Sequence, residues 1–417
     1  MQKRPLAIDL FSGCGGMSLG VEAAGFDVVA AVEIDPIHAL VHELNFPYGV
    51  TFCRDIRQLQ WSEIKAGIQA RGYAAPEIDL LTGGPPCQGF SVMGKRQLDD
   101  PRNQLIFEYV RLLREIQPKY FIFENVQGLA SPRHRTMLTQ LCESLTAAGY
   151  AVLPPRILNG ADYGAPQKRK RLILLGHRQD MPPISYPPLS HGPKLSPYVT
   201  VQKVIADLAP IPVFTDIDQG VYPPETAGTF GQFLDNHLHC CHLRHLDSPK
   251  LWGHLGSNHS LEVQVRFQAA HPGRKEPVSR LFKLDADGLS NTLRAGTPTE
   301  KGSFTAPRPI HYHLPRCISI REAARLHTFP DWFQFHRKVW HGFREIGNAV
   351  LPLLAQKLAA QVIQSLAIEV DSLPQKTIII SQTNRLDYTL SQASQYWDIP
   401  PHLVPRRRRP KSSFKKS

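Results

Sequence analysis

From residue 5 to residue 178, short apolar runs alternate with stretches of helical spacing. Strands are predicted near residues 6–11, 27–33, 77–81, 119–125, 151–155 and 171–176, and helices over 17–24 and 36–45, with Gly25 placed as a left-handed C-cap of the first helix. Strands that alternate with helices build a mostly parallel sheet with crossover helices. We therefore expect a doubly wound α/β domain over residues 1–180.

The alternation ends near residue 181, where Pro-Pro pairs, histidines and short mixed segments take over. This composition predicts a second, smaller, loop-rich domain over 181–335. Ser319 and Glu322 form a capping box that opens a helix stopped by Pro330. A helix over 351–366 has apolar spacing suited to packing back on the first domain, so residues 336–370 are expected to complete it. Residues 371–417 are expected to form a basic, disordered tail.

Composition indicates the class of binding partner and the cellular compartment to expect. The formal net charge is +12, which indicates a polyanionic partner such as nucleic acid. The seven cysteines are scattered and include no CxxC pair, so neither a disulfide framework nor a ribbon-type zinc site is indicated. The sequence shows no secretory signal and no run of eighteen apolar residues, so we expect a cytoplasmic protein without membrane spans.

The first strand runs into a glycine-rich turn, Asp9 to Gly16, and a helix follows. Such a turn lets a nucleotide-like ligand approach the backbone, and Glu33 at the end of the second strand is placed to accept hydrogen bonds from ribose hydroxyls. The dinucleotide fingerprint would need glycine at position 18, where Ser18 stands, so an adenosyl cofactor is favoured over a nicotinamide one. The alternative is that the glycines serve only a tight turn.

Three further segments carry chemistry at the predicted strand ends. Cys87 follows two prolines, which hold the backbone of a loop that presents a thiol; a buried structural cysteine is the alternative. Glu124 ends an apolar run on the same sheet edge and is either a helix cap or a site carboxylate. Strand alternation puts Gln167, Arg169 and Arg171 on one face; a solvated charged strand end is the alternative.

Together these blocks resemble a known family. DLFSGCGG, GGPPCQGFS, ENV, QKRKR, REAARLHTFP and GNAV, in this order, resemble the signature blocks of the cytosine-5 DNA methyltransferases over about residues 5–366. The resemblance implies a Rossmann-like methyltransferase fold and S-adenosylmethionine as methyl donor, with no metal. It also implies that the target cytosine is flipped out of duplex DNA, because the reacting carbon cannot be reached inside the helix.

The resemblance assigns roles to four catalytic residues. Cys87 matches the nucleophile that adds to carbon 6 of the base. Glu124 matches the group that protonates or hydrogen-bonds ring nitrogen 3, a role that predicts a raised pKa. Arg171 matches the contact to the base carbonyl oxygen, and Arg169 matches its neighbour near the nucleophile, where a cation would favour the thiolate.

The resemblance also assigns residues around the cofactor and the base. The Pro85 carbonyl would accept from the exocyclic amine of cytosine, and residues 88–103 resemble a mobile loop that closes over DNA. The cofactor-binding set is Phe11, Gly13, Gly15, Gly16, Glu33, Ile34, Asp55, Ile56, Pro85, Leu105, Asn348 and Val350.

Residues 181–315 fall where the family keeps its variable target-recognition region. The histidine- and cysteine-rich stretch 236–245 invites a zinc interpretation, but its spacing matches no common finger and a DNA-facing loop explains it as well. The segment 279–296 resembles the edge of the recognition region, where polar residues could touch phosphates or bases.

The leading hypothesis is a bacterial, nucleoid-associated modification methylase, acting as a monomer on double-stranded DNA, with a cognate restriction endonuclease encoded separately. The alternatives are the same chemistry on tRNA, a DNA-binding protein with an inactive methylase fold, and a nicotinamide oxidoreductase. Residues 406–417 hold four arginines and three lysines, +7 of the net +12. This tail either attracts phosphates nonspecifically or merely solvates the terminus.

Overall fold

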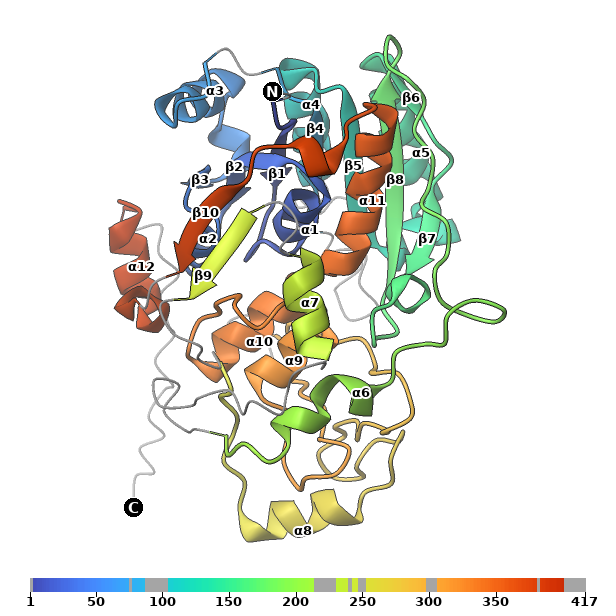
Figure 1. Cartoon of the computed structure of the whole chain (residues 1–417), viewed down its shortest axis with the longest axis vertical. Helices are drawn as coiled ribbons and strands as arrows, with labels where there is room; N and C mark the ends of the chain where they lie inside the picture. Colours follow the sequence, from blue (N-terminus) through green and yellow to red (C-terminus); the bar gives the residue numbers. More distant parts are fainter. Residues whose placement is uncertain are drawn as a thin grey trace, which may run out of the picture.

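A computed structural model describes residues 3–74, 77–86, 104–213, 230–238, 242–246, 253–297, 306–380 and 383–400. A central mixed sheet lies in the upper half of the molecule with helices on its faces, and short helices and loops form the lower half (Figure 1). The strand order is β3-β2-β1-β4-β5-β8-β6, with β7 paired to β8. The predicted α/β fold with a largely parallel sheet is confirmed.

The five strands β1 to β5 form the parallel part of the sheet, and β6 to β8 pair antiparallel around β8. The strands are β1 (Leu6–Leu10), β2 (Asp27–Glu33), β3 (Val50–Cys53), β4 (Leu80–Gly83), β5 (Tyr120–Val126), β6 (Tyr150–Val152), β7 (Arg156–Asn159) and β8 (Lys170–Arg178). All six strands predicted from apolar runs are present. The sequence prediction did not include β7, which has two exposed residues and no continuous apolar run.

Helices connect and cover these strands. They are α1 (Gly16–Ala24), α2 (Pro36–Asn45), α3 (Trp61–Ala70), α4 (Gln104–Ile116), α5 (Arg135–Ala147) and, much later in the chain, α11 (Pro352–Ser365). The predicted cap at Gly25 is confirmed, since this residue has φ +127° and its N–H donates to the carbonyls of Val21 and Glu22. The predicted return of the late helix is also confirmed, because α11 packs on α1.

Two glycines let α1 and α11 approach closely. A Cβ at Gly20 would lie 2.4 Å from the Pro352 carbonyl oxygen, and one at Gly16 would lie 2.4 Å from the Val350 carbonyl oxygen. Neither position can accept a side chain without movement of backbone atoms. The contact therefore joins the glycine turn after β1 to the chain segment that precedes α11.

Residues 181–335 contain short helices separated by loops, in keeping with the predicted low helix content. The helices are α6 (Val201–Ile205), α7 (Phe230–Leu238), α8 (Leu261–Ala269) and α9 (Ile320–Leu326), and α10 (Val339–Asn348) follows. The capping box of Ser319 and Glu322 is confirmed, with reciprocal bonds of 3.1 and 2.7 Å. One apolar cluster joins α1 and α2 to α6, α7, α9 and α10, so the lower half shares a core with two of the helices that cover the sheet.

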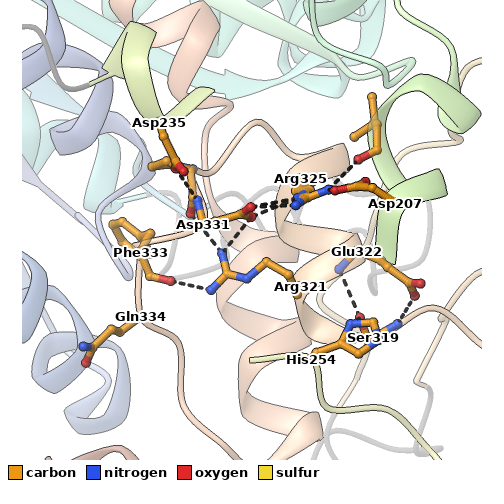
Figure 2. Close-up of polar contacts among 12 residues, drawn as sticks. Asp207, Asp235, His254, Ser319, Arg321, Glu322, Arg325, Asp331, Phe333 and Gln334 are labelled. Carbon is orange, nitrogen blue, oxygen red and sulfur yellow. Dashed lines mark hydrogen bonds and ion pairs between the residues drawn. The ribbon is translucent and has the colours of Figure 1, made fainter. Parts of the chain in front are cut away.

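Buried ion pairs hold these short helices together (Figure 2). The Arg325 guanidinium lies between two carboxylates, 2.6 Å from Asp207 Oδ1 and 2.7 Å from Asp331 Oδ2. Asp235 on α7 accepts a 2.7 Å hydrogen bond from the Asp331 backbone N–H. Arg325 thus has charged partners on two other segments, which offsets its desolvation and fixes their relative positions.

The expectation of a disordered tail from residue 371 is wrong for residues 371–380 and 383–400. This stretch holds β10 (Lys376–Ile380) and α12 (Leu390–Tyr396), with a short 3-10 helix between them (Asn384–Asp387). β10 pairs in parallel with β9 (His242–Leu246), and α12 packs on α2. Structure forms because the rest of the protein supplies the partners. The basic residues 406–417 lie outside the described residues.

The segment Val339–Ser365 is the one stretch of described chain that is long and apolar enough to cross a membrane. It is divided into α10 and α11, and 78% of its most apolar window is buried within the protein. Core helices meet the same criteria.

Candidate active site

The chain reaches the predicted nucleophile from the end of β4. Gly83 ends the strand, and Gly84, Pro85 and Pro86 lead to Cys87, which lies outside the described residues. A Cβ at Gly84 would lie 3.0 Å from Glu124 Oε2. The absence of a side chain at this position therefore lets the loop before Cys87 run directly beside the Glu124 carboxyl group.

Glu124 and Arg171 form an ion pair between neighbouring strands. Arg171 Nε lies 2.7 Å from Glu124 Oε1, and both side chains are largely buried. The pair follows from the register, because β5 and β8 run antiparallel with Val126 opposite Arg171 and Glu124 opposite Ile173. The structure thus brings together two of the four predicted catalytic residues.

Asn125 fixes the proline loop. Its Nδ2 donates a 3.1 Å hydrogen bond to the Pro85 carbonyl oxygen, and its Oδ1 accepts from the Val126 N–H at 2.8 Å. Sequence reasoning used the ENV block but gave Asn125 no role, although its place beside Glu124 was a usable signal. The predicted bond from the Pro85 carbonyl to a cytosine amine would need the second lone pair of the same oxygen.

The guanidinium of Arg169 is directed at backbone carbonyls. It is 1% exposed and donates to the carbonyls of Leu293 at 2.9 Å, Gly347 at 2.9 Å and Ala349 at 2.8 Å. Burial lowers the pKa of this group well below its usual value. Two of the carbonyls lie at the C-terminal end of α10, where helix carbonyls lack intrahelical partners and a cation is favoured by the helix dipole.

Gln167, like Arg169, bonds to distant parts of the chain. The sequence analysis did not predict these contacts. Its Oε1 accepts from the Leu293 N–H, and its Nε2 donates to the Leu326 carbonyl, both at 3.1 Å. His327 Nε2 donates to the Ala349 carbonyl at 3.0 Å. The predicted alternation is confirmed, because Gln167 and Arg169 are buried while Lys168 and Lys170 are exposed.

At the other end of the site, Glu33 joins the ends of β1 and β2. Its Oε2 accepts from the Gly13 N–H at 2.8 Å, and its Oε1 accepts from the N–H groups of Ile34 and Asp35 at 2.9 and 2.8 Å. These bonds hold the carboxylate in one orientation and leave one lone-pair position, on Oε2, for a further donor. The Ile34 side chain is 60% exposed, an apolar surface beside that carboxylate.

The glycine turn requires left-handed backbone. Phe11, Gly13 and Gly15 have φ values of +59°, +58° and +105°. A Cβ at Gly15 would lie 2.4 Å from the Phe46 ring, whereas one at Gly13 would meet nothing within 4 Å. The turn is therefore packed on one side and open on the other.

A buried hydrogen-bond chain lies beneath the turn. Ser18 donates to Asp9 Oδ2 at 2.6 Å, and Thr82 donates to Asp9 Oδ1 at 2.8 Å. His42 Nε2 lies 3.0 Å from the Ser18 oxygen and its Nδ1 lies 3.1 Å from Thr51 Oγ1. Burial raises the pKa of Asp9 to about 6 and lowers that of His42 to about 3, so the imidazole is neutral.

The remaining predicted cofactor residues differ in burial and in their contacts. Asp55 caps a short 3-10 helix (Ile56–Gln58) and pairs with Arg57 at 2.5 Å, an ion pair that lowers the Asp55 pKa. Ile56 and Val350 are buried, Leu105 and Phe11 pack against the same apolar cluster, and Asn348 is exposed.

The open glycine turn, the oriented Glu33 carboxylate and exposed Ile34 fit an adenosyl group. Among the described residues, no group of three His, Cys, Asp or Glu could hold a metal ion. Cys240 and Cys241 of the histidine-rich stretch lie outside those residues.

Comparison with known proteins identifies the family. Residues 6–364 match the model of the C-5 cytosine-specific DNA methylases. The chain is 42% identical to the type II methyltransferase M.XorII of Xanthomonas oryzae pv. oryzae, over 98% of this chain and 96% of that protein. It is 32% identical to M1.HphI of Haemophilus parahaemolyticus, over 86% of each.

Solved structures agree. A putative DNA modification methyltransferase encoded within an E. coli prophage superposes with a TM-score of 0.70 and 32% identity, covering 87% of this chain and all of that one. The S. pombe Dnmt2 methyltransferase shares the fold, with a TM-score of 0.53 and 18% identity over 88% of this chain and all of that one. The chain therefore belongs to the C-5 cytosine-specific DNA methylase family and is a DNA cytosine-5-methyltransferase.

Proposed function

We propose that this enzyme methylates carbon 5 of a flipped-out cytosine within a specific sequence of duplex DNA, with S-adenosylmethionine as donor and through a covalent adduct to Cys87. The observation that carries the proposal is the Glu124–Arg171 ion pair at 2.7 Å. It lies beside the proline loop that leads to Cys87, on a sheet whose strand ends also carry the glycine turn and Glu33.

In the proposed reaction, Cys87, Glu124 and Arg171 each have a separate role. The Cys87 thiolate adds to carbon 6, which makes carbon 5 an enamine-like nucleophile. Glu124 shares a proton with ring nitrogen 3 through a hydrogen bond, so it draws electron density from the ring as the carbon–sulfur bond forms and keeps this proton when the thiolate leaves. Arg171 holds Glu124 and has nitrogen atoms left for the base carbonyl oxygen. After methyl transfer a base removes the carbon 5 proton and the thiolate leaves, so the enzyme is regenerated.

S-Adenosylmethionine supplies an electrophilic methyl group on a sulfonium. Glu33 would bind its ribose hydroxyls, Ile34 would cover one face of the adenine, and the open side of Gly13 would receive the rest of the molecule close to the backbone. These contacts orient the donor without covalent participation of the protein.

The partner and biological setting belong to the same proposal. The relatives' names place them among type II methyltransferases, which supports a role beside a separately encoded restriction endonuclease. We further propose that residues 181–335 form a target-recognition domain, that the enzyme acts in the cytoplasm as a monomer, and that the tail 406–417 adds nonspecific attraction to phosphates.

Labelled S-adenosylmethionine and plasmid DNA provide the test, with bisulfite sequencing to locate the product. The wild type should methylate one cytosine within one short sequence, tRNA should not be labelled, and Cys87→Ser should be inactive. Full activity of Cys87→Ser would refute the nucleophile, and labelled tRNA would refute the choice of substrate.

A second test isolates the covalent step. DNA containing 5-fluorocytosine should trap the enzyme through Cys87, because fluorine prevents the final elimination. Glu124→Gln should trap far more slowly, while Glu143→Gln, at an exposed position on α5, should behave like the wild type. Equal trapping by Glu124→Gln would remove Glu124 from the addition step.

A further inference from the structure

The segment after residue 382 lies beyond the family match, which ends at residue 364. Its residues 383–400 nevertheless pack on the catalytic domain through α12 and the short helix before it. Figure 1 shows α12 on the outer side of α2, away from α11.

The segment forms hydrogen bonds to α2 at two points. Trp397 Nε1 donates a 3.0 Å hydrogen bond to the carbonyl of Pro36, the first residue of α2. Tyr396 donates its hydroxyl to Glu43 Oε2 at 2.6 Å, and Arg385 Nη1 lies 3.5 Å from the same oxygen. The two points are seven residues apart, so the helix is held near both ends.

The same segment is anchored to a third part of the chain. The Leu386 carbonyl accepts from the Arg337 N–H at 3.0 Å, and His336 Nε2 donates to the Tyr388 carbonyl at 2.8 Å. His336 Nδ1 accepts from the Lys338 N–H, so the ring has the tautomer that this donation needs. The segment thus bridges α2 and the turn before α10.

The start of α2 is continuous with the cofactor residues. Asp35 caps the helix by accepting from the Ile37 N–H at 3.0 Å, and its other oxygen pairs with Arg344 of α10 at 3.5 Å. Glu33 accepts from the Asp35 N–H, and Ile34 lies between them. A rotation of α2 would therefore displace both Glu33 and Ile34.

We propose that residues 383–400 are a positioning element that holds α2, and through it Glu33 and Ile34, in the arrangement that receives the adenosyl part of the methyl donor. The inference rests on the proposed function. It assigns no chemical step to the segment. Loss of its contacts should weaken cofactor binding and leave the rate at saturation unchanged.

The test is the double variant Tyr396→Phe/Trp397→Phe in the full-length chain, which keeps an aromatic ring at each position and removes the hydrogen bonds that these two residues make to α2. Tyr198→Phe is the matched control: Tyr198 is 37% exposed against 40% for Tyr396, and it also donates to a carboxylate, that of Asp162 at 3.1 Å. Binding of S-adenosylmethionine by calorimetry and steady-state kinetics are measured for all three proteins.

The double variant should bind S-adenosylmethionine about five- to tenfold more weakly, with KM for the cofactor raised equally and kcat within about twofold of the wild type. The control should match the wild type. Wild-type affinity in the double variant would overturn the inference alone, and so would a fall in kcat at unchanged KM. Failure of the wild type to bind S-adenosylmethionine would overturn the cofactor assignment and this inference with it.

Discussion

Arg169→Met tests whether Arg169 mainly holds the backbone together. Methionine replaces the aliphatic stem of arginine but has no guanidinium, so the carbonyls of Leu293 and Gly347 lose the Arg169 bonds in a buried site. The Ala349 carbonyl keeps its bond from His327. A buried carbonyl without a partner costs about 1–3 kcal/mol.

Two such carbonyls would cost roughly 2–6 kcal/mol, and removal of a desolvated cation offsets part of this. We expect the free energy of unfolding to fall by about 2–4 kcal/mol. Urea unfolding followed by tryptophan fluorescence should show a midpoint lower by about 1 M. Lys168→Met, at an exposed neighbouring position, should leave the midpoint within error of the wild type.

Arg169→Lys separates the two possible roles of this residue. Lysine keeps a positive charge but cannot reach three carbonyls with a planar fork. If Arg169 acts by stabilising the Cys87 thiolate, lysine should preserve most trapping of 5-fluorocytosine DNA. If it acts by holding the backbone, lysine should lower stability nearly as much as methionine does. An unchanged midpoint in both variants would refute the backbone role.

Three further predictions concern packing, protonation and the proline loop. Gly20→Ala should lower the free energy of unfolding by about 1–3 kcal/mol in calorimetry, because its Cβ would lie 2.4 Å from the Pro352 oxygen; an unchanged melting temperature would contradict the close packing. Burial raises the pKa of the Glu345 carboxyl from 4.5 to about 8. The stability that comes from keeping this carboxyl protonated is therefore fully present below pH 4.5. It is lost, by up to about 1.4 kcal/mol per pH unit, as the pH rises to 8. Glu345→Gln should therefore gain melting temperature relative to the wild type between pH 5 and pH 8, and a constant difference would show the carboxyl to be ionised when folded. Asn125→Ala removes the bond to Pro85, so kcat should fall about tenfold or more with KM for S-adenosylmethionine unchanged, whereas a change confined to KM would argue against a role at the loop.

Much of the fold was predictable because its signals are local. Apolar runs located six strands, and the residues that cap helices located α9 and the end of α1. β10 is also an apolar run, and α12 has a capping box at Thr389 and Gln392, but both elements are short. Their stability comes from β9 and α2, which are distant in the sequence, so local patterns gave them little weight.

From the sequence, the candidate residues could be placed on strands and at strand ends, but the directions of their side chains could not all be predicted. Alternation correctly put Arg169 on the same face as Gln167. It could not reveal that the guanidinium meets carbonyls of residues 293, 347 and 349, because those contacts depend on how three distant segments pack. The chain beneath the glycine turn was missed for the same reason, since Asp9, Ser18 and His42 come from three different elements.

The packing of α1 on α11 has a consequence for synthesis of the chain. Gly20 and Pro352 touch, yet about 330 residues separate them. At translation rates of about 5–20 residues per second, α11 is synthesised roughly 20–60 s after α1. During this interval the apolar face that α11 will cover is exposed to solvent. The nascent enzyme is therefore expected to be protected by a chaperone, or to collapse only slowly in its first half, until the last third of the chain has left the ribosome.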